Sequence, residues 1–260
     1  MEIVPPVSII IPTLNEEKYL PLLLDSLKRI SAPLDIIVVD GNSEDDTVQV
    51  VEQYRSYFTN PSSLRLIRSA ERGISLQRNL GAAVAKHAIL IFCDADIVVP
   101  SPEAHTGLLS EFIKGRYVAA NPRLVPIESD IHYRMFHTTW YFAQRFLLLF
   151  GRPYLAGGYL ITTQEAFLAT GEFDVNVVLG EDVHYSLRVG KIGQCAVFSI
   201  SYQVSARRLV KYGHGWLFTQ IPNIFRFLFT GRLVSESIYY PFGEYSGQKA
   251  HHVTNNKGKS

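Results

Sequence analysis

Cysteine, net charge and long apolar runs are all scarce in this chain, and each shortage excludes a class of protein. Of the 260 residues, two are cysteines, and the formal net charge is +1. Both cysteines, Cys93 and Cys195, stand in apolar, strand-like runs, which favours reduced, packed thiols in a cytosolic protein over a disulfide or a zinc site. The charge balance argues against a nucleic-acid-binding protein. With 47% hydrophobic and 19% charged residues, the composition is that of a globular protein.

Apolar runs long enough to cross a membrane are missing. A spanning helix needs about 20 mostly apolar residues, whereas the two longest candidates, 140–150 and 212–225, are interrupted by Arg145 and Pro222. Residues 1–6 contain no basic stretch followed by an apolar core, so we expect no signal peptide. No internal repeat is visible. The length therefore allows one large α/β domain or two small ones.

Two carboxylates directly after an apolar run are the feature around which the chain is organised. Residues 89–93 have the pattern of a strand buried on both faces of a parallel sheet, and Asp94 and Asp96 follow them. Ligands of such sheets bind beyond the carboxyl ends of the strands. In extended chain, side chains two residues apart point the same way, so we expect both carboxylates to face one divalent cation or polar ligand. Two solvated loop acids are the alternative.

Strand and helix patterns alternate through the first hundred residues. Short apolar runs predict strands over residues 7–11, 35–39, 64–67 and 89–93. Asn15 fits the N-cap of a helix after the first strand, and Ser43 with Asp46 resembles a capping box that opens the second helix. A third helix is expected over 75–86. The sequence therefore predicts a doubly wound, mostly parallel sheet flanked by helices, with right-handed crossovers.

Several motifs, taken in order and spacing, resemble one known family. In the first half they are Pro12-Thr13-Leu14-Asn15-Glu16, Val38-Val39-Asp40-Gly41-Asn42-Ser43, Arg78-Asn79-Leu80-Gly81 and Asp94-Ala95-Asp96. Together they resemble glycosyltransferase family 2, whose fold is the nucleotide-sugar-binding α/β type called GT-A. The similarity continues through Gly157-Gly158-Tyr159, Gly171-Glu172-Phe173-Asp174 and Glu181-Asp182. The family more often has Gly-Gly-Phe where this chain has Gly171-Glu172-Phe173, and the resemblance fades beyond about Arg208.

The resemblance implies a site for a nucleotide-diphosphate sugar, with UDP- or GDP-sugars as the expected donors. Asp96, together with Asp94, would hold Mg²⁺ or Mn²⁺, which suits oxygen ligands and would stabilise the leaving diphosphate. Asp40 would accept a hydrogen bond from the base, or it caps the following helix. Further donor-binding residues implied by the family are Pro12, Thr13, Asn15, Glu16, Arg78 and Ala95. Their simpler alternatives are a helix-dipole acid for Glu16 and a surface cation for Arg78.

Glu181 and Asp182 open an amphipathic helix that is expected to end near Val189. Acids at a helix N-terminus are favoured by the helix dipole alone. The family resemblance implies more, namely that Asp182 is the general base that deprotonates an acceptor hydroxyl, with Glu181 beside it. Direct in-line displacement by that hydroxyl would invert the anomeric carbon. The acceptor would be a glycan or a lipid-linked hydroxyl.

A basic loop follows the last expected strand. Arg207, Arg208 and Lys211 cluster there, and His214 stands nearby. We expect Arg207 and Arg208 to contact the donor diphosphate and His214 to complete the metal shell, so that Arg207→Ala or Arg208→Ala weakens donor use. A solvated basic loop is the alternative for each residue.

Two aromatic segments do not belong to the sheet pattern. One helical stripe carries Phe136, Trp140, Ala143, Leu147 and Phe150, and residues 216–229 are similarly rich in aromatics. Helices packed on the sheet are one interpretation. The other is a basic and aromatic surface that binds anionic membranes without spanning them.

The sequence predicts an inverting, metal-dependent glycosyltransferase in the cytoplasm or at the cytoplasmic face of the membrane. We expect a GT-A catalytic domain over 1–210, with a nucleotide-binding half (1–100) and an acceptor half (101–210). A helical aromatic segment (211–245) and a disordered tail (246–260) would follow. The alternatives are a nucleotide-sugar-binding or membrane-docked protein without turnover, and a sugar-phosphate nucleotidyltransferase, which would carry a glycine-rich basic loop after the first strand. Donor sugar, acceptor and oligomeric state do not follow from the sequence.

Overall fold

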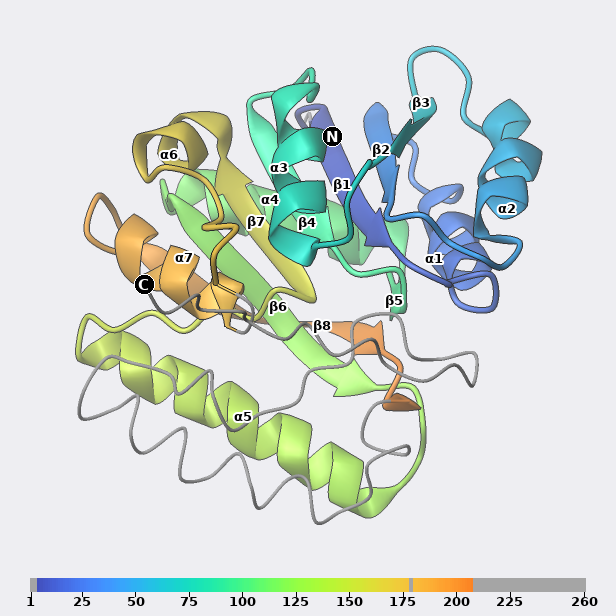
Figure 1. Cartoon of the computed structure of the whole chain (residues 1–260). Helices are drawn as coiled ribbons and strands as arrows, with labels where there is room; N and C mark the ends of the chain where they lie inside the picture. The colour runs from blue at the N-terminus through green and yellow to red at the C-terminus, as the bar shows by residue number, and fades with distance from the viewer. Residues whose placement is uncertain (1–3, 178–179, 208–260) are drawn as a thin grey trace, which may run out of the picture.

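The described part of the computed structural model, residues 4–177 and 180–207, is built on one mixed sheet (Figure 1). Its strands lie in the order β3-β2-β1-β4-β7-β6-β8-β5. They are β1 (Val7–Thr13), β2 (Leu34–Asp40), β3 (Ser63–Arg68), β4 (Ile89–Cys93), β5 (Ile97–Val98), β6 (Ala119–Pro126), β7 (Tyr159–Thr163) and β8 (Cys195–Val204). Strands β1 to β4 are parallel, as are β6 and β8, whereas β7 and β5 run antiparallel to their neighbours. The prediction of a mostly parallel sheet is confirmed.

Helices cover both faces of the sheet. They are α1 (Leu20–Leu27), α2 (Thr47–Tyr54), α3 (Ile74–Ala83), α4 (Pro102–Lys114), α5 (Ile131–Leu149), α6 (Gln164–Ala169) and α7 (Glu181–Val189), with a short 3-10 turn at Arg55–Tyr57. Helices α1, α2 and α4 share one apolar core with one face of the strands, and α3, α5, α6 and α7 share a second core with the other face. This is the predicted doubly wound arrangement.

The alternation of side chains along β1 divides the two cores. Ile9 and Ile11 belong to the core under α1, whereas Ile10 belongs to the core under α3, because successive residues of a strand point to opposite faces. On the second face, α3 approaches β1 closely at Gly81, where a Cβ atom would lie 2.4 Å from Ile10 Cγ2. A glycine at this position therefore sets how near α3 lies to the sheet.

The two helix caps predicted from the sequence are wrong. Asn15 has a positive φ of 58° and α1 begins five residues later, at Leu20. The helix α2 begins at Thr47 after Asp46, which makes no side-chain cap hydrogen bond. The two loops bind each other instead, since Asn15 N–H donates to Ser43 Oγ over 2.9 Å and Asn15 Oδ1 accepts from the backbone N–H of Glu44.

Both cysteines are free thiols, as predicted. None of the helices in the described ranges is long and apolar enough to cross a membrane. Arg208, Lys211, His214 and the predicted segments 211–245 and 246–260, including the aromatic residues 216–229, lie outside the described residues. The domain boundary near residue 210 stays a prediction.

Candidate active site

Three of the predicted donor residues, Pro12, Thr13 and Asp40, lie where β1 and β2 end side by side. The strand register pairs Thr13 with Asp40, and Thr13 Oγ1 donates to Asp40 Oδ1 over 3.4 Å. The buried Asp40 carboxylate also accepts hydrogen bonds from the backbone N–H and the hydroxyl of Ser43. Asp40 thus orders the loop after its own strand, and the capping alternative is wrong, because α2 starts only at Thr47. Pro12 and Thr13 are buried at the end of β1.

Gln77 is a residue of this region that sequence reasoning missed. From α3 its Nε2 donates to the carbonyl oxygens of Thr13 (2.9 Å) and Val39 (2.7 Å), and so it ties the ends of β1 and β2 together. A fully buried amide among the packing positions of a helix is the available signal, because a buried polar group needs partners.

Arg78, the next residue of α3, joins four segments of the chain. Its guanidinium donates to Glu181 Oε1 over 2.8 Å, to Asp94 Oδ1 over 3.0 Å and to the Gly157 carbonyl over 3.0 Å. It also lies over the ring of Phe173, 5.2 Å from its centroid. The side chain is 1% exposed, so the surface-cation alternative is wrong. Its contact with phosphate stays a prediction.

Glu181 and Asp182 begin α7, which ends at Val189 as predicted. Asp182 Oδ2 accepts from the Gly157 N–H over 2.7 Å, and its Oδ1 accepts from the Val183 N–H over 2.8 Å. Burial and the neighbouring Asp182 charge raise the pKa of Glu181 to about 7, although Arg78 acts in the opposite direction. Burial likewise raises the pKa of Asp182. Glu181 is buried and Asp182 half-buried, and both hold a proton more tightly than ordinary carboxylates do.

Asp94 and Asp96 do not stand in extended chain. The Ile97 N–H donates to the Asp94 carbonyl, and Ala95 and Asp96 form the turn between β4 and β5. The extended conformation expected for this segment is therefore wrong, and in the structure Asp94 binds Arg78 and Asp96 binds Arg207. A shared cation stays a prediction.

Arg207 forms a second buried ion cluster. Its Nη1 and Nη2 donate to the two oxygens of Glu16 over 2.6 and 2.7 Å, and its Nε donates to Asp96 Oδ2 over 3.0 Å. The guanidinium stacks 4.2 Å from the Tyr19 ring centroid. The side chain is 6% exposed, which contradicts the solvated-loop alternative for this residue. Glu16 is therefore more than a helix-dipole acid.

The predicted metal ligands offer the oxygen chemistry that Mg²⁺ and Mn²⁺ bind. However, residues 4–177 and 180–207 contain no group of three His, Cys, Asp or Glu side chains placed to hold a metal ion. Two carboxylates would leave most of the coordination sphere of such a cation to a diphosphate, an arrangement that Mg²⁺ commonly adopts, so the metal site stays a prediction. Such a cation at Asp96 would compete with Arg207, and His214 lies outside the described residues.

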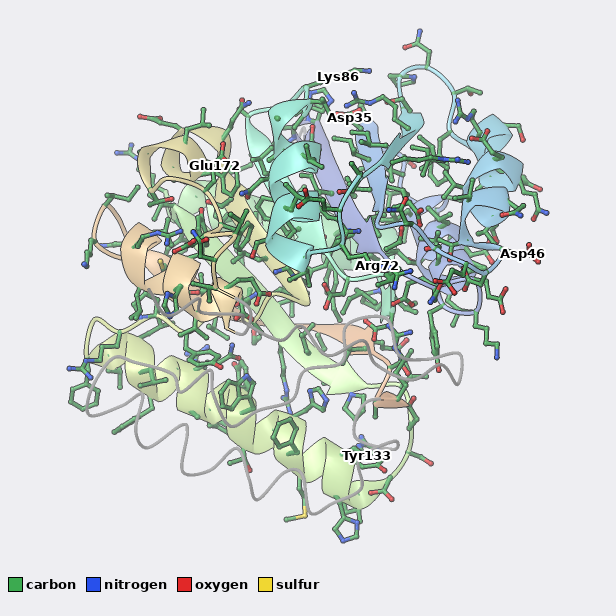
Figure 2. All side chains as sticks on the ribbon, in the orientation of Figure 1. Asp35, Asp46, Arg72, Lys86, Tyr133 and Glu172 are labelled. Carbon is green, nitrogen blue, oxygen red and sulfur yellow. The ribbon has the colours of Figure 1, made fainter. Side chains whose placement is uncertain are left out.

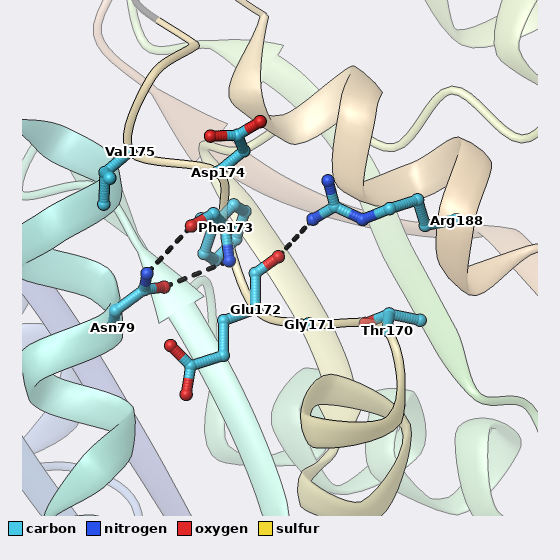
Figure 3. A pocket seen from close by; sticks show the side chains of 8 residues that line it. All are labelled: Asn79, Thr170, Gly171, Glu172, Phe173, Asp174, Val175 and Arg188. Atoms are coloured by element: carbon cyan, nitrogen blue, oxygen red, sulfur yellow. Dashed lines mark hydrogen bonds between the residues drawn. The ribbon is translucent and has the colours of Figure 1, made fainter.

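A wide, shallow pocket lies next to this site, and it is lined by residues of two family motifs but by none of the predicted catalytic, donor-binding or metal-binding residues. It is lined by Asn79, residues 170–175 and Arg188 (Figure 3). The Asn79 amide donates to the Phe173 carbonyl over 2.8 Å and accepts from the Phe173 N–H over 3.1 Å, while Arg188 donates to the Glu172 carbonyl. These bonds fix the Phe173 ring against Arg78, so the pocket wall supports the site.

The buried Asp35, at the other end of β2 from Asp40, is a structural carboxylate with which the acids of the site can be compared. Asp35 binds Arg65 through two hydrogen bonds, at 3.0 and 2.7 Å, and lies next to Lys86 at the end of the sheet opposite Asp40 (Figure 2). Although burial opposes it, hydrogen bonds from Arg65 and Ser8 lower the pKa of Asp35. Its pKa thus shifts in the opposite direction to those of Glu181 and Asp182.

Comparison with known proteins identifies sequence relatives over part of the chain. The model of one family, Glycosyl transferase family 2, matches residues 8–170. The 4,4'-diaponeurosporenoate glycosyltransferase of Staphylococcus haemolyticus is 32% identical over 116 residues, or 43% of this chain and 29% of that protein. The poly(ribitol-phosphate) beta-N-acetylglucosaminyltransferase TarS of Staphylococcus aureus is 35% identical over 94 residues, or 34% of this chain and 16% of that protein. The matches span less than a third of these curated relatives.

Solved structures share the fold. TarS residues 1–349 superpose with a TM-score of 0.62 at 18% sequence identity, over 86% of this chain and 72% of that chain. The complex of TarS 1–349 with UDP-GlcNAc superposes with a TM-score of 0.61 at 19% sequence identity, over 78% of this chain and 59% of that chain. The mannosyltransferase PcManGT from Pyrobaculum calidifontis, in complex with GDP-Man and Mn²⁺, superposes with a TM-score of 0.59 at 20% sequence identity, over 77% of this chain and 57% of that chain. The fold is therefore of the GT-A type. Since the family model covers more than half of the chain, the protein belongs to glycosyl transferase family 2.

Proposed function

We propose that the protein transfers a sugar from a UDP- or GDP-sugar to an acceptor hydroxyl, with inversion at the anomeric carbon. One observation carries the proposal: the buried Arg78 binds Asp94, at the end of β4, and Glu181, next to Asp182 on α7. Acids predicted for the donor and for the acceptor thereby meet at one guanidinium. This convergence is what a single transfer site requires.

The ends of β1 and β2 form the proposed nucleotide side. Asp40 and the loop of Asn15 and Glu16 lie there, held by Gln77 and Ser43. Their carboxylate and amide oxygens suit the N–H groups of a base and the hydroxyls of a ribose. The UDP-GlcNAc and GDP-Man complexes of the structural neighbours support a nucleotide-sugar donor.

Asp182 is the proposed general base. Its half-buried carboxylate has a raised pKa, which makes it a better proton acceptor for a hydroxyl than an ordinary aspartate. The acceptor oxygen forms a bond to the anomeric carbon while the bond from that carbon to the diphosphate oxygen breaks, and the hydroxyl proton passes to Asp182. The electron pair of the broken bond leaves with the diphosphate.

The charge that develops on the diphosphate needs a cation. When bound, Mg²⁺ or Mn²⁺ would neutralise that charge, and Asp96 with Asp94 would hold it. Arg207 is the cation already next to Asp96 and would contact the diphosphate oxygens if the metal displaced it. The Mn²⁺ named in the PcManGT complex supports this choice of metal.

The proposed catalytic domain extends to about residue 210, because Arg207 still binds Glu16 and Asp96. Residues 211–245 would form the appended aromatic segment and residues 246–260 the tail. The cytoplasm, or the cytoplasmic face of a membrane, is the proposed location, where nucleotide sugars would serve as donors. The acceptor would be a growing glycan or a lipid-linked hydroxyl.

Donor binding and turnover test the proposal in two steps. Thermal stability is measured with UDP- and GDP-sugars, with and without Mn²⁺, and donor consumption is then followed with glycan and lipid-linked acceptors. We expect one nucleotide to stabilise the protein, and Asp182→Asn to keep that stabilisation while losing turnover by about 10²–10⁴-fold. Binding without turnover for any acceptor would favour a nucleotide-sugar-binding protein. Turnover that survives in Asp182→Asn would reject the assigned base.

A further inference from the structure

The helix α5 exposes large apolar side chains on the face that points away from the sheet. Between 56% and 81% of the surface of Ile131, Met135, Phe142, Phe146 and Leu149 is exposed. Residues of an α-helix advance by about 100° each, so these five residues lie along one line, which we call the α5 stripe. It is about 27 Å long at a rise of about 1.5 Å per residue.

The α5 stripe differs from the aromatic stripe predicted from the sequence. Leu147 of the predicted stripe is buried, and Phe136, Trp140 and Ala143 are half-buried, so that set mostly packs the helix onto the molecule. The α5 stripe lies opposite the buried Tyr133, Gln144 and Leu147. A helix that is apolar on two opposite faces has a second surface to cover.

The charges around the α5 stripe are mainly positive. The helix contains no Asp or Glu, and the exposed Arg134 flanks the stripe, with Arg152 just beyond its end. Arg145 lies on the same side as Arg134, although its guanidinium also donates to the Tyr141 hydroxyl and the Val197 carbonyl. The nearest acids are engaged, since Asp130 caps the N-terminus of α5 and Glu128 accepts from Ser205 Oγ and the Ala206 N–H. Cationic side chains beside an apolar ridge complement an anionic surface with an apolar interior.

We propose that the α5 stripe docks the protein on an anionic lipid bilayer, with α5 lying in the plane of the interface. The helix α5 lies along one side of the described part of the chain (Figure 1), and an exposed apolar ridge on such a helix suits a flat, deformable partner better than a protein groove. Peripheral binding of this kind needs an apolar face and flanking cations, not a spanning helix.

The packed face of α5 connects the docking surface to the proposed acceptor side. Gln144 Nε2 donates to the Tyr154 carbonyl over 2.8 Å, and the rings of Trp140 and Tyr154 lie edge to face at 4.7 Å. Three residues further along, the Gly157 N–H binds Asp182. A bilayer against the α5 stripe would therefore lie one helix away from the acids that face the acceptor.

Vesicle binding by the full chain tests the proposal without any sugar donor, so its outcome is independent of the transfer reaction. Vesicles of phosphatidylcholine, with or without phosphatidylglycerol, are sedimented with the protein. We expect binding to the anionic vesicles, weaker at high salt, and weak or no binding to phosphatidylcholine alone. The double variant Phe142→Gln/Phe146→Gln should lower the partition by about tenfold or more, since two exposed rings lose their apolar contact.

The matched control makes the same kind of change elsewhere. Ile113 on α4 and Ile192 after α7 are exposed apolar residues outside the stripe, and Ile113→Gln/Ile192→Gln should bind vesicles as the unmodified chain does. Thermal unfolding of both variants shows that they fold. The proposal is overturned if the full chain does not sediment with anionic vesicles, or if both double variants bind equally well. Self-association of the chain that is lost only in Phe142→Gln/Phe146→Gln would overturn it too, because the stripe would then join two copies.

Discussion

Two buried arginines, Arg78 and Arg207, have the same kinds of side-chain partner but differ in how the backbone holds them. Arg78 binds Asp94 and Glu181 and lies over Phe173, and Arg207 binds Glu16 and Asp96 and lies over Tyr19. Each has two carboxylates and one aromatic ring. A buried charge is tolerated only with such compensation.

The difference lies in the backbone. Arg78 comes from the middle of α3 and also donates to the Gly157 carbonyl, whereas Arg207 reaches the Glu16 and Asp96 carboxylates from the segment that follows β8. We interpret Arg78 as a permanent link between donor and acceptor acids. We interpret Arg207 as a counter-ion that an incoming cation can replace.

Removal of Arg78 should have the largest effect. In Arg78→Gln the carboxylates of Asp94 and Glu181 lose their buried partner, and we expect a loss of about 3–5 kcal/mol in the free energy of unfolding, together with loss of turnover. Denaturant unfolding and donor consumption measure the two effects. Arg65→Gln, which removes the partner of Asp35 at the opposite end of the sheet, should destabilise the protein and leave turnover per folded molecule unchanged. Equal turnover in both variants would contradict the linking role.

A methyl group at Gly157 should disturb the same cluster to a smaller extent. The added Cβ would lie 2.7 Å from Arg78 Nη2, so Gly157→Ala forces the guanidinium to shift, at a cost of about 1–3 kcal/mol. Gly151→Ser is a useful contrast, because a Cβ there has no neighbour within 4 Å and the cost is confined to its positive φ of 65°. Thermal unfolding distinguishes them. Turnover should fall in Gly157→Ala alone, and its retention would show that Arg78 has room to move.

Metal affinity tests whether the second arginine is replaceable. Arg207→Gln removes the positive charge from Asp96 and Glu16, so we expect Mn²⁺ alone to bind about tenfold more tightly, which corresponds to about 1.4 kcal/mol. Titration calorimetry with Mn²⁺, without donor, measures it. Arg72→Gln, which breaks an exposed pair with Glu44, serves as the control and should leave the affinity unchanged. Unchanged affinity in Arg207→Gln would place the metal away from Asp96.

The pH dependence of stability should show the smallest effect. Folded Glu181 keeps its proton to about pH 7, whereas its ordinary pKa is 4.5. Between these values the folded chain binds more protons than the unfolded chain, so this group's contribution to stability decreases as pH rises. Glu181→Gln should flatten that decrease in melting temperature. The acidic limb of turnover should move little, because Glu181 is still protonated, and so uncharged, in the pH range where Asp182 loses its proton. A large shift of that limb would show that the two acids share one proton.

The sequence predicted those elements whose residues carry their own pattern. The apolar runs of β1, β2 and β4 and the acidic start of α7 identified these elements to within about two residues. The caps at Asn15 and Ser43 failed because these side chains bind across two loops, 28 residues apart, and no local pattern records such a partner. The two residues of β5 are too few for a periodicity. Arg78 and Arg207 were identified as candidates, but their partners depend on the tertiary structure.

The close packing of α3 on β1 has a practical consequence for redesign. Gly81 lets the helix pack directly on Ile10, and Arg78 lies one turn earlier on that helix. The distance between α3 and the sheet therefore determines where Arg78 meets the acids of the donor side and of the acceptor side. A bulkier residue at position 81 would push α3 away from the sheet and displace Arg78 from its carboxylate partners, although no acid of the site would have changed. Attempts to change the accepted nucleotide should therefore graft new residues into the loop from Asn15 to Tyr19 and leave Gly81 alone.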